Sequence, residues 1–332
     1  MKNLDNYEQR LLWALDLNAR LPFTKLGKKI GLSPQLTKYK FESLLKRGII
    51  NNTMAVVNMY KLGWYAYRIY LRLEKESLNS DKVVLDYLKN SQYTVWIVSC
   101  IGKYDIEYLL LADTPIKAAQ IVDEINENIG KYIKEYIVSP AVGNIHLNRM
   151  YLNPKLEQRK TVHYGFNTSE KNQLDLTDLK ILKLLSTNAR LSNIEISKEI
   201  DVSYNTIKYR IKELEKNKII EGYRVFNNLE KLNRQFFKII IYTKTLSKKD
   251  RNDILAFCSK ELDMVYVNFC FGGWELELET ESENNTKTLE LLHRFLEKFG
   301  SFVKDYEIIQ VLKEHKLNYL PNINLLIKDY KK

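Results

Sequence analysis

The sequence predicts an α+β fold in which two winged helix-turn-helix domains alternate with two βαββαβ, ferredoxin-like domains. Three observations lead to this prediction: the chain repeats itself once, each repeat opens with apolar residues at helical spacing, and each continues with alternating segments typical of strands. The chain has 332 residues, of which 45% are hydrophobic and 28% are charged. It is therefore long enough for several domains with packed cores.

The repeat aligns without a gap at a shift of 170 residues. The segment LDNYEQRLLWALDLNARL from Leu4 matches LDLTDLKILKLLSTNARL from Leu174, so that NAR triplets begin at Asn18 and Asn188. Much farther along the chain the same shift pairs Cys100 with Cys270. A period this long indicates a duplicated two-domain unit, because solenoid repeats span roughly 20–50 residues.

Each repeat begins with three predicted helices, which are clearest in the second copy. Asp175 can cap the first helix, a short helix follows over residues 193–200, and Asp201-Val202 makes a tight connection to a third helix capped by Ser203. The third helix of such a motif enters the major groove of DNA, with polar residues on base edges and basic residues on phosphates. We therefore expect double-stranded DNA as a partner, bound by Ser33, Gln35, Lys38, Tyr39, Lys40, Ser203, Tyr204, Asn205, Lys208, Tyr209, Arg210 and Lys212. The strand-like stretch EGYRVFNN after Ile220 is expected to be a wing, with Arg224 near a phosphate.

After the wing the periodicity changes from helical to alternating, which marks a second domain. Strand and helix patterns follow in the order β-α-β-β-α-β in both copies, the order of the ferredoxin-like motif. Such a domain must cover its free sheet face, so pairing with the second copy is expected, within the chain or between chains as a homo-oligomer. We place the domains at 1–60, 61–146, 174–232 and 233–318, with a polar linker at 147–173 and a tail at 319–332.

The charge distribution favours a polyanionic partner. Lys and Arg outnumber Asp and Glu by 10 to 4 in residues 1–60 and by 12 to 9 in residues 171–232. The ferredoxin-like segments are nearly balanced, at 10 against 11 for residues 61–145 and 16 against 15 for residues 233–332. The basic excess therefore lies in the helix-turn-helix segments and is weaker in the second copy.

These residues resemble the Lrp/AsnC family of bacterial and archaeal regulators. The match rests on LD before an apolar helix, the NAR triplet, and SYNTIKYRIKELEKNKIIEGY, and it covers nearly all of residues 4–145 and 174–315. The resemblance implies a winged helix followed by a ligand-responsive ferredoxin-like (RAM) domain, assembled as dimers or higher oligomers that bind DNA and sense amino acids. In the first copy Lys40 stands at the position of Arg210 in the second copy, and Pro34 follows Ser33. We therefore expect the two helix-turn-helix domains, the two readers of the DNA sequence, to be unequal and the DNA site to be asymmetric.

The resemblance also implies where an effector would bind. In the family this site usually lies near the turn between the second and third strands of the ferredoxin-like domain. The corresponding residues here are Gly102, Tyr104, Asp105, Gly272, Trp274 and Glu275. Two alternatives remain open from the sequence: the glycines can serve only a tight turn, and Tyr104 and Trp274 can belong to the core of an interface.

The sequence also bears on metal, cofactor, membrane and enzyme functions. The three cysteines have no metal-ligand spacing and are expected to be buried thiols, no cofactor motif is present, and no apolar run is long enough for a bilayer, so a cytoplasmic protein without metal or cofactor is expected. Siroheme decarboxylases look like tandem or paired members of this architecture, but their second-strand region carries histidine and arginine, whereas SQYTVWIVSCIGKYD and DMVYVNFCFGGWE have no histidine. We therefore expect a transcription regulator and no enzyme. The alternatives are such an enzyme, or an effector or assembly protein that has lost DNA binding.

Overall fold

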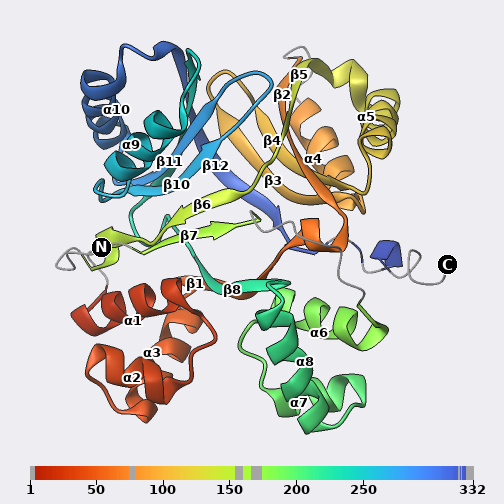
Figure 1. Cartoon of the computed structure of the whole chain (residues 1–332), viewed down its shortest axis with the longest axis vertical. Coiled ribbons are helices and arrows are strands. Elements are labelled where there is room, and N and C mark those ends of the chain that lie inside the picture. Colours follow the sequence, from red (N-terminus) through yellow and green to blue (C-terminus); the bar gives the residue numbers. More distant parts are fainter. Residues whose placement is uncertain are drawn as a thin grey trace.

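The computed structural model describes residues 4–74, 79–153, 160–165, 174–320, 322 and 324–326. Both helix-turn-helix domains lie at one end of the molecule and both ferredoxin-like domains at the other, with strands between them (Figure 1). The two copies pair within the single chain, which is one of the two arrangements expected from the sequence. The three cysteines are buried free thiols, as predicted.

The two helix-turn-helix domains have the predicted helices. The first contains α1 (Asn6–Leu17), α2 (Phe23–Ile30) and α3 (Pro34–Lys46), and the second contains α6 (Leu176–Thr187), α7 (Asn193–Ile200) and α8 (Tyr204–Lys216). Asp5 and Asp175 cap α1 and α6 through capping boxes, since each accepts a hydrogen bond from the backbone N–H three residues on. The tight connection before α8 is made by Asp201, whose φ of 55° is left-handed.

The strand after the third helix differs from the prediction. Strands β1 (Ile50–Val57) and β8 (Ile220–Asn227) pair with each other, antiparallel, in a two-stranded ribbon that joins the copies. The predicted wing of the second copy is therefore half of a shared ribbon, and Arg224 is only 1% exposed instead of lying near a phosphate. The sequence pattern identified a strand but carried no information on its distant partner.

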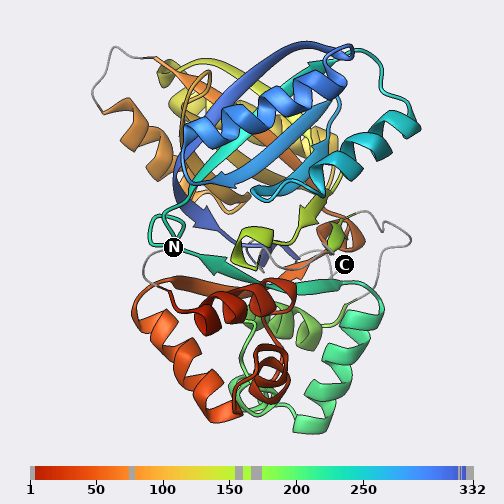
Figure 2. The same ribbon diagram turned by 90° about the vertical axis from the view of Figure 1, so that its left-hand side faces the viewer.

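Each ferredoxin-like domain has the predicted element order. The first contains β2 (Tyr65–Leu73), α4 (Ser80–Asn90), β3 (Thr94–Ile101), β4 (Ile106–Ala112), α5 (Pro115–Ile129) and β5 (Ile133–Pro140). The second contains β9 (Gln235–Thr243), α9 (Lys248–Cys258), β10 (Met264–Phe269), β11 (Leu276–Ser282), α10 (Asn285–Phe299) and β12 (Val303–Leu317). The helices cover the outer faces of the sheets (Figures 1 and 2).

The last strand of each copy continues into the sheet of the other. Strand β12 pairs first with β9 and then, from Gln310 onward, with β3 of the first copy. In the same way, β6 (Asn144–Leu147) follows β5 and pairs with β10 of the second copy. Strand β7 (Thr161–Tyr164) then adds to β6, so part of the predicted linker is a strand, while residues 154–159 and 166–173 lie outside the described residues.

The NAR triplets lock the two helix-turn-helix domains together. Arg20 donates hydrogen bonds to the carbonyl oxygens of Ala189 and Leu191, and Arg190 donates to those of Ala19 and Leu21. The contact is thus reciprocal about an approximate two-fold axis. Each guanidinium satisfies carbonyl groups of the loop after the first helix in the opposite copy.

The two sheets bury charged residues between their facing sides. Lys238 of β9 lies 2.7 Å from Glu107 of β4, and the Tyr70 hydroxyl of β2 donates to Glu277 of β11 at 2.7 Å. Burial raises the pKa of the Glu107 carboxyl, and Lys238 only partly offsets this effect. Removing one partner of such a pair leaves an uncompensated buried charge, so these contacts hold the copies in one register.

A second buried cluster joins helix α1 to the sheets. Arg149 contacts Asp16 and also pairs with Glu281 at 2.7 Å, while the His146 ring lies 3.5 Å from Asp16. Burial lowers the pKa of His146 to about 4, with a further contribution from the positive charge of Arg224 and an opposing one from Asp16. His146 is therefore neutral in the folded protein at neutral pH.

Replacing His146 with Gln is expected to make folding less sensitive to acid. The folded pKa of His146 lies below its unfolded value of about 6.5, so the unfolded chain takes up a proton first as the pH falls, and stability is lost between about pH 6.5 and pH 4. The wild type should lose about 2.5 kcal/mol more than the variant between pH 7 and pH 4.5, as measured by urea unfolding. His293→Gln on α10, where the side chain is exposed, is the control. Parallel pH profiles for wild type and His146→Gln would contradict this account.

Candidate nucleic-acid interface

Helix α3 presents the polar face predicted from the sequence. Ser33 caps the helix by accepting a hydrogen bond from the Leu36 N–H at 3.2 Å. Gln35, Lys38 and Tyr39 are exposed, and 67% of Tyr39 is accessible to solvent. These side chains offer an amide for base edges and an ammonium and a hydroxyl for phosphates.

Helix α8 presents the corresponding face in the second copy. Ser203 caps it by accepting a hydrogen bond from the Thr206 N–H at 3.2 Å. The helix buries Ile207, Ile211 and Leu214, and its outer side is polar. The exposed residues of that side include Tyr204, Asn205, Lys208, Tyr209 and Lys212.

Two of the predicted DNA-binding residues have a different role. The Lys40 ammonium lies 2.6 Å from the carboxylate of Asp5, the cap of α1. In the second copy the Arg210 guanidinium lies 2.7 Å from Asp175 and 3.3 Å from Asp178. Both cations therefore fasten the third helix to the start of the first, and we correct their assignment from DNA contact to domain packing.

The second helix of the motif distinguishes the two copies most strongly. Lys25, Lys28 and Lys29 are exposed on α2, whereas Glu195 and Glu199 occupy the positions of Lys25 and Lys29 on α7. Over residues 23–46 there are six Lys or Arg and one acidic residue, and over residues 193–216 there are five of each. In helix-turn-helix proteins the helix before the recognition helix crosses the DNA backbone. The first copy is thus far better suited to contact phosphates.

The predicted effector turns are part of the contact between copies. Tyr104 and Trp274 are both almost fully buried and pack on Tyr70, with ring centroids 5.3 and 4.9 Å away. Asp105 and Glu275 each accept a hydrogen bond from a strand N–H, at 2.8 and 2.7 Å. The structure thus favours the alternative that Tyr104 and Trp274 form interface core, and the effector assignment stays a prediction.

The two glycines of these turns serve the turn geometry. Gly102 has φ +134°, and a β-carbon there would lie 2.8 Å from the Ile308 carbonyl oxygen of the other copy. Gly272 has φ +83°, a conformation that L side chains rarely adopt. Neither turn contributes residues to the cavities described below.

Comparison with known proteins identifies the family. A winged helix-turn-helix DNA-binding family model matches residues 4–51 and 174–221. Regulatory protein AsnC of Haemophilus influenzae is 26% identical over 107 residues, which are 29% of this chain and 71% of that protein. An uncharacterized HTH-type transcriptional regulator of Pyrococcus furiosus is 30% identical over 131 residues, which are 38% of this chain and 87% of that protein. The chain belongs to the Lrp/AsnC family. It is a tandem member, since the family's unit occurs twice.

A solved structure matches this Lrp/AsnC chain along its whole length. The siroheme decarboxylase NirDL has a TM-score of 0.66 and 11% identity, and the match covers 99% of this chain and 100% of that one. The likeness shows a shared fold, tandem arrangement included. It also overturns our prediction that the chain is not an enzyme: a solved enzyme has this architecture along the whole chain, so the absence of histidine from the second-strand segments does not suffice for that conclusion.

The described part of the Lrp/AsnC chain contains neither a membrane-spanning helix nor a cluster of metal-binding side chains. No described helix combines the length and the apolarity needed to cross a bilayer. Nor do three or more His, Cys, Asp or Glu side chains of the described ranges gather in a way that could hold a metal ion.

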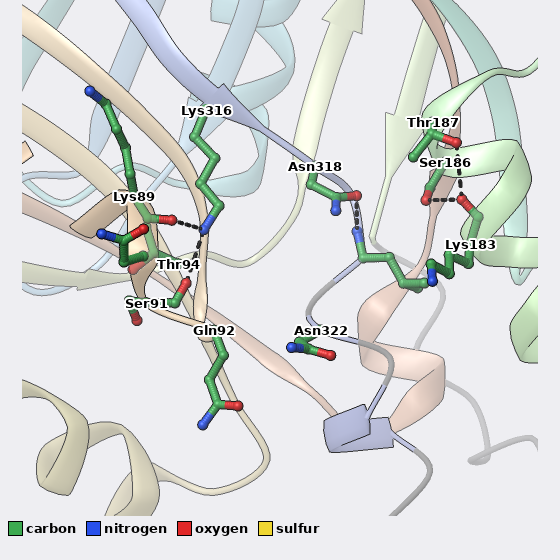
Figure 3. Close-up of a pocket in the computed structure, with 12 residues that line it drawn as sticks. Lys89, Ser91, Gln92, Thr94, Lys183, Ser186, Thr187, Lys316, Asn318 and Asn322 are labelled. Carbon is green, nitrogen blue, oxygen red and sulfur yellow. Dashed lines mark hydrogen bonds between the residues drawn. The ribbon is translucent and has the colours of Figure 1, made fainter. Parts of the chain in front are cut away.

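A basic pocket lies where the first ferredoxin-like domain meets the second helix-turn-helix domain. It measures about 380 Å³ and is lined by Lys89, Lys183 and Lys316 together with Ser, Thr and Asn side chains (Figure 3). The Lys316 ammonium donates to the carbonyl oxygens of Lys89 and Ser91, at 2.8 and 2.9 Å. Burial lowers the pKa of Lys316. Lys316 thus caps the carboxyl end of α4 and ties β12 to the first copy.

The sequence interpretation missed the buried charged residues. Strand β11 reads LELETES and is buried along its whole length, so Glu277, Glu279 and Glu281 face the other sheet while the intervening residues face their own helices. From the sequence we expected a second copy to cover the free sheet face but assigned no role to these carboxylates. The sequence did hold a signal for this burial, because a sheet face that a second copy covers buries every residue on it. Carboxylates on that face must then find partners inside the contact.

Replacing Arg210 with Gln is expected to weaken the second helix-turn-helix domain without changing the salt dependence of DNA binding. Its ion pairs to Asp175 and Asp178 are partly exposed, so about 0.5–1 kcal/mol of unfolding free energy should be lost. Thermal unfolding and filter-binding titrations over a range of salt concentration measure the two effects. Lys208→Gln, on the same helix, is the matched contrast. A salt dependence as shallow as that of Lys208→Gln would restore Arg210 to the DNA contact.

Proposed function

We propose that this chain is a sequence-specific double-stranded DNA-binding transcription regulator. The observation that carries the proposal is the pair of third helices, each with an exposed polar and basic face, in domains that lie at the same end of the molecule (Figures 1 and 2). Paired helix-turn-helix domains bind two half-sites about one helical turn apart. The reciprocal Arg20 and Arg190 contacts and the β1–β8 ribbon would hold the two readers at a fixed spacing.

The two readers have different tasks in this proposal. The first copy supplies most of the phosphate contacts, because Lys25, Lys28 and Lys29 stand on the helix that crosses the backbone. The second copy supplies base contacts through residues such as Asn205, while Glu195 and Glu199 repel phosphates. The expected site is therefore asymmetric, with strong backbone protection on one side.

We also propose, from membership of the family, that binding responds to a small-molecule effector such as an amino acid. Further association of chains into higher oligomers belongs to the same proposal. Both properties are separable from DNA binding in experiment.

Replacing Lys38 or Lys208 with Ala is expected to weaken DNA binding and its dependence on salt. Each lysine that neutralises a phosphate contributes about 0.9 to the slope of log K against log salt, so each variant should lose about that much. Gel-shift titrations at several salt concentrations, with DNA from upstream of the gene and a scrambled control, measure both effects. Lys82→Ala on the exposed side of α4 is the control, since it lies on the ferredoxin-like domain. Unchanged DNA binding in both recognition-helix variants would contradict the proposal.

Exchanging the charges of the second helices tests the unequal readers. Lys25→Glu combined with Lys29→Glu should lower affinity at least tenfold, and Glu195→Lys combined with Glu199→Lys should raise it, because one removes and the other adds phosphate contacts. Hydroxyl-radical footprints of the wild type should be deeper on one half-site. The Glu195→Lys, Glu199→Lys protein should give a more even footprint. A wild-type footprint with strict two-fold symmetry would argue against the division of tasks.

A further inference from the structure

A large cavity lies between the helix-turn-helix pair and the ferredoxin-like sheets. Its volume is about 920 Å³, within the range of small-molecule sites in proteins, which is roughly 300–1,000 Å³. Its floor is the β1–β8 ribbon, with Val56, Arg224 and Phe226. Strands of both sheets form its roof, where Arg68, Trp96 and Lys238 line it. Residues of both copies therefore line this space.

Arg224 is the lining residue with the most unused hydrogen-bonding capacity. Its side chain is 1% exposed, and its Nε and Nη2 atoms have no acceptor in regular hydrogen-bond geometry, although the Tyr319 hydroxyl lies close enough to interact with the guanidinium. One contact is satisfied, from Nη1 to the Tyr266 hydroxyl, and the Asp16 carboxylate is 3.8 Å from Nη2. A buried donor without an acceptor destabilises the protein, and more so when the donor is charged. Two free N–H groups of one guanidinium match the two oxygens of a carboxylate.

The other cations of the cavity are already engaged. Arg149 contacts Asp16 and Glu281, and Lys238 lies between Glu107 and Glu279. Arg234 pairs with Asp263 at 2.6 Å and Glu283 at 3.5 Å. Arg224 thus offers a carboxylate ligand two donors without an acceptor, whereas Arg234 offers one, its Nε.

Neutral polar groups that line the cavity are unsatisfied as well. Both side-chain atoms of Asn227, on the same strand, are buried without a partner, and so is Oδ1 of Asn144. Both residues line the cavity. These amide groups remain available to polar groups of the ligand other than its carboxylate.

The remaining wall is aromatic. Arg224 lies among the hydroxyl groups of Tyr164, Tyr266 and Tyr319, and Phe226 packs on Tyr319 with ring centroids 6.1 Å apart. Phe236 and Trp96 extend this wall across the roof. Flat rings pack against such a surface in offset or edge-to-face geometry.

We propose that this cavity binds a small aromatic carboxylate, whose carboxylate pairs with Arg224 and whose ring packs among the surrounding tyrosine and phenylalanine side chains. The site is distinct from the two strand turns, which are closed by the contact between copies. Binding is measured without DNA, so it stands or falls separately from the proposed regulator function. Because the ligand touches the ribbon that joins the two readers, it is placed to act on their spacing.

The test uses two anionic probes and their neutral amides on the full-length protein. Indole-3-acetate and 1-naphthoate should bind saturably in isothermal titration calorimetry, and indole-3-acetamide and 1-naphthamide should bind at least tenfold more weakly, because the amides lose the charge-assisted pair. Arg224→Gln should weaken binding of the acids at least tenfold and leave the amides nearly unchanged. Arg10→Gln on the exposed side of α1 is the matched control.

A second variant keeps the proposal testable if Arg224→Gln does not fold. Ala66→Phe fills the cavity from its roof, leaves Arg224 in place, and should also abolish binding of the acids. Circular dichroism and urea unfolding establish that each variant is folded. No saturable binding of either acid up to about 1 mM would overturn the proposal, as would equal binding of acids and amides. Binding lost in Arg68→Gln but kept in Arg224→Gln would overturn it too.

Discussion

The structure depends on the burial of two sheet faces against each other. A ferredoxin-like domain covers one face of its sheet with helices and leaves the other open, and here the open faces carry Glu107, Lys238 and Glu277. These residues are satisfied only when both copies are present, because the lysine comes from one sheet and one carboxylate from the other. The crossed strands β12 and β6 then fix the register. The β1–β8 ribbon connects the helix-turn-helix domains to the paired sheets, so the pairing of the sheets also positions these domains.

Local pattern was enough to predict the elements and their order. Caps such as Asp175 and Ser203 and the spacing of apolar residues located the helices of both copies, and alternation located the strands of the ferredoxin-like domains. Long-range pairing was beyond that reasoning, since nothing near Ile220 shows that β8 pairs with β1. For that reason Arg224 was predicted to lie near a DNA phosphate, although it is buried in the ribbon that β8 forms with β1.

The candidate interface was predicted in part. Exposed residues such as Lys38 and Tyr209 stand where the helical pattern placed them. Lys40 and Arg210 do not, because at their position on the helix a long cationic side chain reaches the capping carboxylate of the first helix. Family resemblance placed the effector at the strand turns, but Tyr104 and Trp274 fill the contact between sheets. A siroheme decarboxylase has the same tandem fold, so the function has to be argued from side chains and not from the fold.

Joining the two copies in one chain changes how their pairing depends on protein abundance. Separate subunits come apart when they are scarce, since dimerisation follows mass action. In this chain the partner is always present at the effective concentration that the connection imposes, however few molecules a cell contains. Occupancy of a DNA site by such a protein would rise with the first power of its concentration. A cell could therefore keep very few molecules and still retain the paired form in every one of them.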